Sequence, residues 1–380
     1  MVLSRRHFCF ITAPDISMSS FSVNAETPRT PRILISYFFG ADMIPLGASC
    51  ANGLRELGWD VACFNSQVES RINLYFLKYV TKLLRAFGWK SMDVANKTPW
   101  NNDRFRAAQL ERAVAAFRPD VLLVIRGNHF DGPTLQRIKA RYNVRKTVGW
   151  WVKDPRTTSE MIDDAKNYDY YFCIHRFGYG STDRIAHLTA LAVDRDTYHP
   201  AEPHSAKTHE LVFVGGWSQR RQEMLQALSD LPLEIYGPGW SKLRVSAALR
   251  RKLKAPRIWG PALTALYGRS KIVLNVSSWD PQRTGLNLRT FDVPATGAFF
   301  LTDEAAELRN YFTPGVEIET FSSASELREK AEFYLTHDQQ REDIAQRGYA
   351  RVLGLETYTD KMRSLLSAIG EPVSHAVPVQ

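Results

Sequence analysis

Short, almost uninterrupted apolar runs alternate with longer amphipathic segments from Arg32 onward. Such runs are typical of strands buried on both faces of a parallel sheet, and the amphipathic segments are typical of the helices that connect them. In the first half the pattern predicts strands over 33–39, 59–65, 121–125, 146–151 and 170–174. It predicts helices over 46–57, 69–87 and 102–117. This order of elements indicates an α/β domain.

The second half repeats this alternation with a different sequence. The pattern predicts strands over 211–214, 233–236, 257–259, 271–276 and 298–302, and helices near 219–228 and over 285–296. Further along, apolar residues recur at helical spacing, which predicts C-terminal helices that pack against the body of the protein. The residues on these predicted apolar faces are Leu327, Ala331, Tyr334, Leu335, Tyr358, Met362, Leu365 and Ile369.

We therefore expect two Rossmann-like, doubly wound α/β domains that face a central cleft at the carboxyl ends of their strands. A length of 380 residues agrees with two domains, because it exceeds the length that one compact core usually holds. A polar, proline-containing stretch without periodicity marks the linker. The expected parts are a disordered extension at 1–31, a first domain at 32–195, a linker at 196–208, a second domain at 209–355, a C-terminal helix that packs back on the body at 356–370 and a tail at 371–380.

Composition excludes several classes of protein. With 44% hydrophobic and 23% charged residues, the chain is neither largely disordered nor collagen-like nor a coiled coil. No apolar run approaches the ~18 residues that a membrane-spanning helix needs. The four cysteines lack CxxC spacing, so they predict neither a zinc site nor a disulfide framework and favour a reducing cytoplasm.

The first residues resemble a bacterial export signal, because Ser4-Arg5-Arg6-His7-Phe8 has the twin-arginine pattern. Only Phe8 to Ala13 is apolar before Pro14 and Asp15 interrupt the run, whereas a signal peptide needs roughly 7 to 15 apolar residues. We therefore expect a cytoplasmic protein, with export as the less favoured alternative.

Charge narrows the choice of ligand. Lys and Arg exceed Asp and Glu by 49 − 40 = 9, which favours anionic ligands. The basic residues are scattered and no nucleic-acid-reading motif accompanies them, so nucleic acid is not an expected partner. Phosphorylated small molecules and anionic membrane surfaces remain open, and the basic surface is compatible with a membrane-attached acceptor and with peripheral membrane association.

The segment 285–303 combines groups that suit a diphosphate nucleotide. Gly285 is expected to open a helix whose first turn lacks an acidic residue, so that its backbone N–H groups are free for an anion. Arg289 would hold phosphate and Asp292 would accept hydrogen bonds from ribose hydroxyls, and Asn287 is expected to belong to the same site. The alternative is a solvated i, i+3 pair of Arg289 and Asp292, worth about 0.2 to 0.5 kcal/mol. Spacing alone leaves both open.

A second candidate follows the predicted strand at 211–214. Gly215 and Gly216 would let a phosphate approach the backbone, and Arg220 or Arg221 would supply positive charge. Simple turn chemistry and a solvated arginine pair explain the same residues.

Three further stretches contain residues with possible chemical or binding roles. Asp154 and His175 follow predicted strands and face the expected cleft, so either is a candidate general base. The alternatives are that Asp154 caps a turn and that His175 is a hydrogen-bonded structural histidine. Asp194-Arg195-Asp196 has the spacing of a DxD metal motif but falls in the predicted interdomain region, so no metal site is expected there. The loop at 40–47 is no GxGxxG fingerprint, which argues against an NAD-dependent dehydrogenase.

Taken together, these stretches resemble the CgeB-like (spore-maturation-protein-like) glycosyltransferases of the GT-B fold. The resemblance extends from about Arg32 to Ile369 and is strongest in the second half. It rests on Phe213–Gly216 with Arg220, Ile258-Trp259-Gly260, Leu266-Tyr267, Ile272–Asn275, the run 289–303 and the ending from Tyr349 to Tyr358.

The resemblance implies transfer of a sugar from a nucleotide diphosphate held mainly by the second domain to an acceptor held mainly by the first. It places Gly215, Gly216 and Arg220 near the diphosphate, Arg289 and Asp292 on phosphate and ribose, and Trp259 at the base. Three positions depart from the family: Asp292 replaces a usual Glu, Thr296 a common Cys, and Thr284 the acid of related retaining enzymes. The last departure leaves the stereochemical outcome open.

We therefore expect a metal-independent glycosyltransferase whose donor is a nucleotide-diphosphate sugar and which needs no other cofactor. The acceptor is left open among a saccharide, a lipid-linked glycan, a protein and a small molecule. Two alternatives are a sugar-nucleotide epimerase of the same fold and a catalytically inactive protein that binds nucleotide-sugars or polyanions.

Overall fold

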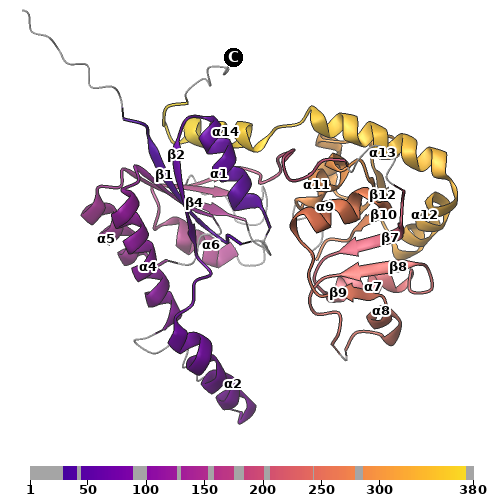
Figure 1. The fold of residues 1–380 in the computed structure, drawn as a ribbon, viewed down its shortest axis with the longest axis horizontal. Helices are drawn as coiled ribbons and strands as arrows, with labels where there is room; N and C mark the ends of the chain where they lie inside the picture. Colours follow the sequence, from indigo (N-terminus) through magenta and orange to yellow (C-terminus); the bar gives the residue numbers. More distant parts are fainter. Residues whose placement is uncertain are drawn as a thin grey trace, which may run out of the picture. The chain divides into compact units, whose positions relative to one another are not determined.

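The structure is a computed structural model that describes residues 29–40, 44–88, 101–125, 130–152, 158–174, 184–200, 206–242, 244–278 and 286–373. It contains two six-stranded sheets in which every strand is parallel to its neighbours (Figure 1). Residues from Pro31 onward form one compact unit, which contains both sheets. The expected α/β fold with two Rossmann-like domains is confirmed.

The sheet of the N-terminal domain has the order β2-β1-β3-β4-β5-β6. Its strands are β1 (Arg32–Tyr37), β2 (Asp60–Asn65), β3 (Val121–Ile125), β4 (Lys146–Trp151), β5 (Tyr170–Cys173) and β6 (Ile185–His187). Its helical segments are α1 (Leu46–Glu56), the π-helical η1 (Asn73–Leu77), α2 (Lys78–Ala86), α4 (Asn102–Phe117), α5 (Gly132–Tyr142) and α6 (Thr158–Ala165).

The sheet of the C-terminal domain has the order β12-β11-β10-β7-β8-β9. Its strands are β7 (His209–Val214), β8 (Leu233–Tyr236), β9 (Leu253–Ala255), β10 (Ser270–Asn275), β11 (Phe299–Asp303) and β12 (Glu319–Phe321). Its helical segments are α7 (Gln219–Gln226), α8 (Ala247–Arg251), α9 (Gly260–Gly268), α11 (Arg289–Ala295), the short 3-10 helix η3 (Ala306–Asn310), α12 (Ala324–Thr336) and α13 (Asp338–Leu353).

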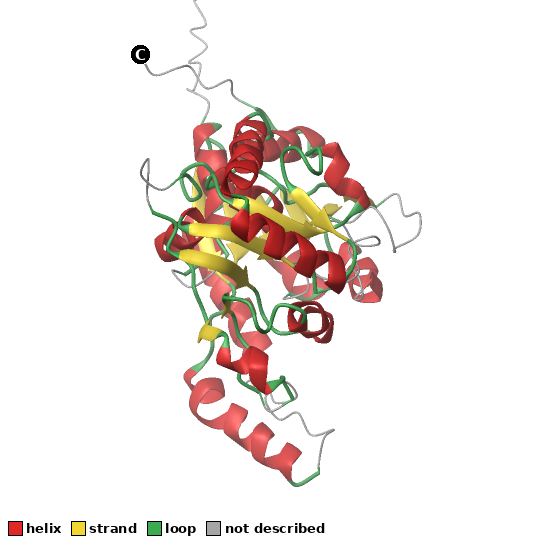
Figure 2. Ribbon diagram, turned by 90° about the vertical axis from the view of Figure 1, so that its right-hand side faces the viewer, coloured by secondary structure: helices red, strands yellow, loops and turns green. Residues whose placement is uncertain are grey.

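Helices cover both faces of each sheet, as the near-continuous apolar strands require (Figure 2). In the N-terminal domain α1 packs on one face, and α4, α5 and α6 pack on the other. In the C-terminal domain α7, α8 and α12 lie on one face, and α9 and α11 on the other.

The last helix, α14 (Tyr358–Ala368), returns to the N-terminal domain and packs beside α1 (Figure 1). Gly53 of α1 permits this contact, because a Cβ there would lie 2.8 Å from the backbone nitrogen of Thr359. The apolar residues predicted for this helix, among them Met362 and Leu365, are fully buried. The chain therefore crosses between the domains twice, once before β7 and once before α14.

Two predicted elements differ from the structure. Residues 257–259 are not a strand; the edge strand is β9, and Trp259 is the N-cap of α9. Gly260 there has a φ of +57°, which lies outside the range of a strand. The proline that follows it suits the first turn of a helix and cannot donate a hydrogen bond to a sheet ladder. The helix predicted over 285–296 is shorter, because α11 begins at Arg289 and carries Asp292 in its first turn.

Candidate functional site

The candidate site is a cavity of about 380 Å³ beyond the carboxyl ends of the C-terminal strands. Residues of both domains line it. In doubly wound folds ligands bind outside the carboxyl ends of the strands, so the location is the expected one. The C-terminal domain contributes Gly215, Gly216, Arg221, Gly237, Pro238, Trp259, Asn287, Arg289 and Asp292 to the lining.

The loops that follow β7 and β8 form the glycine-rich wall of the cavity. The Gly215 N–H donates to the Tyr236 carbonyl at 2.8 Å, and the Trp217 N–H donates to the Pro238 carbonyl at 2.8 Å. Gly237 has a φ of +148°, and a Cβ on it would lie 2.1 Å from the Gly215 carbonyl oxygen. Only glycine fits this contact, which fixes the position of the Gly215–Gly216 turn.

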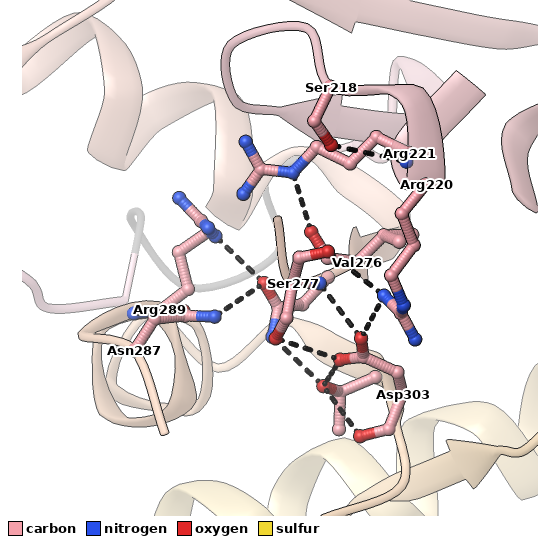
Figure 3. Close-up of polar contacts among 10 residues, drawn as sticks. Ser218, Arg220, Arg221, Val276, Ser277, Asn287, Arg289 and Asp303 are labelled. Carbon is pink, nitrogen blue, oxygen red and sulfur yellow. Dashed lines mark hydrogen bonds and ion pairs between the residues drawn. The ribbon is translucent and has the colours of Figure 1, made fainter. Parts of the chain in front are cut away.

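Arg221 is a buried cation on the wall of this cavity. Its Nε donates to the Val276 carbonyl at 2.7 Å (Figure 3). Its Nη1 donates to the Gly216 carbonyl at 2.8 Å. Burial, together with the nearby positive charge of Arg289, lowers its pKa to about 9. An anion in the cavity would offset the cost of burying this charge.

Arg220, the neighbouring residue on α7, has a different role. Its Nη1 donates to the Asp303 carboxylate at 2.7 Å and to the Ser277 carbonyl at 2.9 Å (Figure 3). Asp303 is buried and also accepts the Ser277 N–H at 2.8 Å. Arg220 does not belong to the cavity lining. This ion pair therefore ties α7 to the ends of β10 and β11.

Asn275, at the end of β10, positions the second cavity arginine. Its side-chain oxygen accepts the Nε of Arg289 at 2.9 Å and the amide of Asn287 at 3.1 Å. Its own amide donates to the Thr302 hydroxyl at 2.9 Å, which fixes the orientation of the Asn275 side chain. Arg289 is thus held by its Nε, and its terminal nitrogens make no hydrogen bond with the described residues.

Asp292 lies three residues after Arg289 on α11 and is hydrogen-bonded by Tyr198. Burial raises its pKa well above the ordinary range, and Asp194 adds to the shift, while Arg289 and the Tyr198 hydroxyl oppose it. Arg289 is hydrogen-bonded to Asn275 rather than to Asp292, so the alternative of a simple solvated helix pair does not describe the site. The carboxyl group lines the cavity within reach of a polar ligand.

Trp259 lies at the edge of the cavity, at the start of α9. Its indole Nε1–H is buried and has no hydrogen-bond partner among the described residues. A buried donor of this kind costs free energy until a ligand or water pairs with it. The indole therefore offers a flat apolar face and one unsatisfied donor to a ligand.

The comparisons with known proteins agree with this geometry. The model of a protein family described as "Glycosyl transferase-like" matches residues 220–367. Spore protein CgeB of Bacillus subtilis (strain 168) is 23% identical over 279 residues, which cover 67% of this chain and 84% of CgeB. The chain is a glycosyltransferase of the GT-B fold.

Two solved structures show the same fold for this glycosyltransferase. Sucrose-phosphate synthase from Thermosynechococcus elongatus gives a TM-score of 0.60 at 11% identity, covering 90% of this chain and 98% of the other. HepE from Anabaena, in complex with UDP and glucose, gives a TM-score of 0.58 at 9% identity, covering 90% of this chain and 99% of HepE. The resemblance to CgeB-like glycosyltransferases that the sequence indicated is confirmed, and neither the epimerase nor the inactive binding protein is favoured.

The structure of the glycosyltransferase brings most of the predicted donor residues together. Gly215, Gly216, Trp259, Asn287, Arg289 and Asp292 all line one cavity, whereas Arg220 is not among the lining residues and pairs with Asp303. Asp154, His175 and Gly285 lie outside the described residues, so their roles stay predictions.

Sequence reasoning missed several residues of the site. Among the additional residues that line the cavity are Tyr198, Tyr236, Gly237 and Pro238. Arg221 was named only as an alternative to Arg220. The glycine after the strand at 233–236 was a usable signal, because it repeats the strand–glycine pattern of Gly215.

The rejected DxD motif is a turn in the glycosyltransferase. Asp194 accepts the Thr197 N–H at 3.0 Å and also pairs with the Ser49 hydroxyl, while Asp196 is exposed. Among the described residues no group of three or more histidine, cysteine or acidic side chains is placed to hold a metal ion. Nor does the described part of the chain contain a helix long and apolar enough to cross a membrane.

Proposed function

We propose that this glycosyltransferase uses a nucleoside diphosphate sugar as its donor and binds it in the cavity of the C-terminal domain. The observation that carries the proposal is the convergence of two arginines, Arg221 and Arg289, on a cavity with a glycine-rich wall. Diphosphates need both positive charge and close approach to backbone N–H groups. The Gly216 N–H has no partner among the described residues and suits this role.

The remaining groups of the cavity suit the nucleoside. Trp259 would stack on the base, and its unpaired Nε1–H would donate to a base or ribose oxygen. The Asp292 carboxyl would bind ribose hydroxyls. HepE, whose fold is similar, was solved with UDP and glucose. This supports a diphosphate nucleotide as the class of donor.

The two arginines would also promote the reaction. Negative charge grows on the diphosphate as the bond to the sugar breaks, and fixed cations stabilise this charge more strongly in the transition state than in the ground state. Arg221 and Arg289 are fixed in this way by hydrogen bonds to Val276, Gly216 and Asn275. We propose that these side chains stabilise the leaving group and that transfer needs neither a metal ion nor a further cofactor.

The acceptor would enter from the N-terminal domain. This domain contributes mainly apolar side chains to the cavity, including Ile44, Leu46, Val152 and Ile174. We propose Asp154 or His175 as the base for an acceptor hydroxyl if the reaction inverts configuration. A saccharide, a lipid-linked glycan, a protein or a small molecule would each present such a hydroxyl.

The experiment that tests this proposal measures release of nucleoside diphosphate from a panel of sugar nucleotides incubated with candidate acceptors. We expect turnover with one donor class by the wild type and a loss of at least ~100-fold in kcat/KM in Arg289→Met, because charged hydrogen bonds are lost. Arg328→Met is the matched control. Arg328 lies on α12, does not line the cavity and pairs with Asp230. Equal turnover by Arg289→Met, or isomerised sugar without acceptor, contradicts the proposal.

A further inference from the structure

The segment 71–87 exposes an unusual amount of apolar surface. It holds seven of the eleven large apolar side chains that are most exposed in the described chain, at 43% to 72% exposure. They are Ile72, Leu74, Tyr75, Phe76, Tyr79, Leu83 and Phe87. Figures 1 and 2 both show α2 extending away from the sheet of its domain. Contiguous exposed apolar surface of this kind marks an interaction site.

The exposed side chains form a stripe at helical spacing. Ile72, Phe76, Tyr79, Leu83 and Phe87 follow one another at intervals of four, three, four and four residues. The other side of the segment contacts the protein, because Asn73, Leu77 and Thr81 are buried. The burial of that side fixes the rotation of the helix, so the apolar stripe faces solvent.

Basic residues form a second ridge beside the stripe. Arg71, Lys78 and Lys82 each precede a stripe residue by one position, and all three are exposed. Over 69–88 the sequence has four basic residues against the single acid Glu69, which pairs with Lys78. The segment thus joins an apolar face to a positively charged flank, the pattern of helices that lie in the interface of an anionic membrane.

We propose that η1 and α2 dock this protein on an anionic membrane surface. The stripe would enter the boundary between headgroups and acyl chains, and Arg71, Lys78 and Lys82 would contact the anionic headgroups. A second copy fits less well, because it would place the same positively charged segment against itself. This inference does not depend on the proposed donor site.

The test is co-sedimentation of the full chain with phosphatidylcholine vesicles that do or do not contain phosphatidylglycerol. We expect binding to the anionic vesicles only, weakened by salt. The variant Phe76→Ser/Leu83→Ser/Phe87→Ser should bind at least about 100-fold more weakly. The variant Lys78→Gln/Lys82→Gln should lose about fivefold per lysine, or about 25-fold.

Two control variants remove similar groups elsewhere. Val316→Ser/Phe333→Ser/Leu353→Ser changes exposed apolar residues of the C-terminal domain, and Lys242→Gln/Arg251→Gln changes exposed basic ones. Both should bind vesicles like the wild type. Melting curves show that each variant is folded before vesicle binding is compared; the Phe333 substitution should lower the melting temperature somewhat, because this ring packs on Tyr334 and His337.

Three results would overturn the proposal. The first is a wild-type protein that stays in solution with anionic vesicles. The second is undiminished binding by the folded apolar-stripe variant. The third is a concentration-dependent dimer that the stripe substitutions dissolve, without vesicle binding, which would assign the stripe to a second copy.

Discussion

The adjacent arginines of α7 provide a sharp test of how the site is built. Arg221 lines the cavity and is held by the carbonyls of Val276 and Gly216. Arg220 is turned toward Asp303, 2.7 Å away. Replacing each in turn by methionine removes one positive charge from neighbouring positions of one helix. We expect Arg221→Met to weaken donor binding and Arg220→Met to weaken the fold.

The magnitudes follow from these contacts. Hydrogen bonds to charged groups contribute about 1.5 to 3 kcal/mol each, so losing one between Arg221 and a diphosphate should weaken binding about 10- to 150-fold. Arg220→Met leaves Asp303 buried without its cation. Because Arg220 is 32% exposed, we discount the usual cost of breaking a buried pair and expect about 2 kcal/mol of lost stability.

The assay is isothermal titration of each variant with the nucleoside diphosphate that the wild type binds best, beside urea unfolding without ligand. Arg220→Met should bind within about threefold of the wild type, because Arg220 does not line the cavity and its charge is paired with Asp303. A folded Arg220→Met protein that loses affinity as strongly as Arg221→Met would refute this assignment and support Arg220 as the diphosphate ligand.

Three further predictions address other parts of the site. Trp259→Leu should weaken nucleoside diphosphate binding by about tenfold, through lost stacking, and leave inhibition by pyrophosphate unchanged; equal effects on both ligands would contradict a role at the base. Gly237→Ala should lower stability by at least about 2 kcal/mol in urea unfolding, since its Cβ would meet the Gly215 carbonyl at 2.1 Å. Asp292 binds its proton more tightly when folded, because burial raises its pKa, so the wild type should lose stability as pH rises from about 4. The Asp292→Asn variant lacks this loss, so its melting temperature should rise relative to that of the wild type between pH 4 and about 8. Melting temperatures that change in parallel over this range would contradict the raised pKa.

The sequence pattern predicted the fold well where apolar runs were long and clearly bounded. The strands over 121–125, 146–151 and 233–236 and the helix over 102–117 match the structure residue for residue. The strands β6 and β12, only three residues long, were missed because such short runs carry too little pattern. At 257–259 the apolar pair Ile258 and Trp259 suggested a strand. The glycine and proline that follow this pair instead begin α9.

The site was predictable as a set of residue types and less so as a geometry. Glycines after strands and the Arg289–Asp292 spacing pointed to residues that line one cavity in the structure. Nothing in two consecutive arginines tells which one faces it, because that depends on how Ser218 caps α7 and on the buried Asp303. The Asn275 contact with Arg289 joins residues fourteen positions apart and arises only from the fold.

The most direct test of the central claim is a thermal-shift titration of the wild type, Arg289→Met and Arg328→Met with UDP, GDP, dTDP, CDP and ADP. At ~100 times its dissociation constant a ligand adds about 2.7 kcal/mol, enough to raise the melting temperature by about 5 °C. We expect such a shift with at least one diphosphate in the wild type and in Arg328→Met, and its loss in Arg289→Met. A shift that Arg289→Met retains in full, or no shift with any of the five, would contradict that claim.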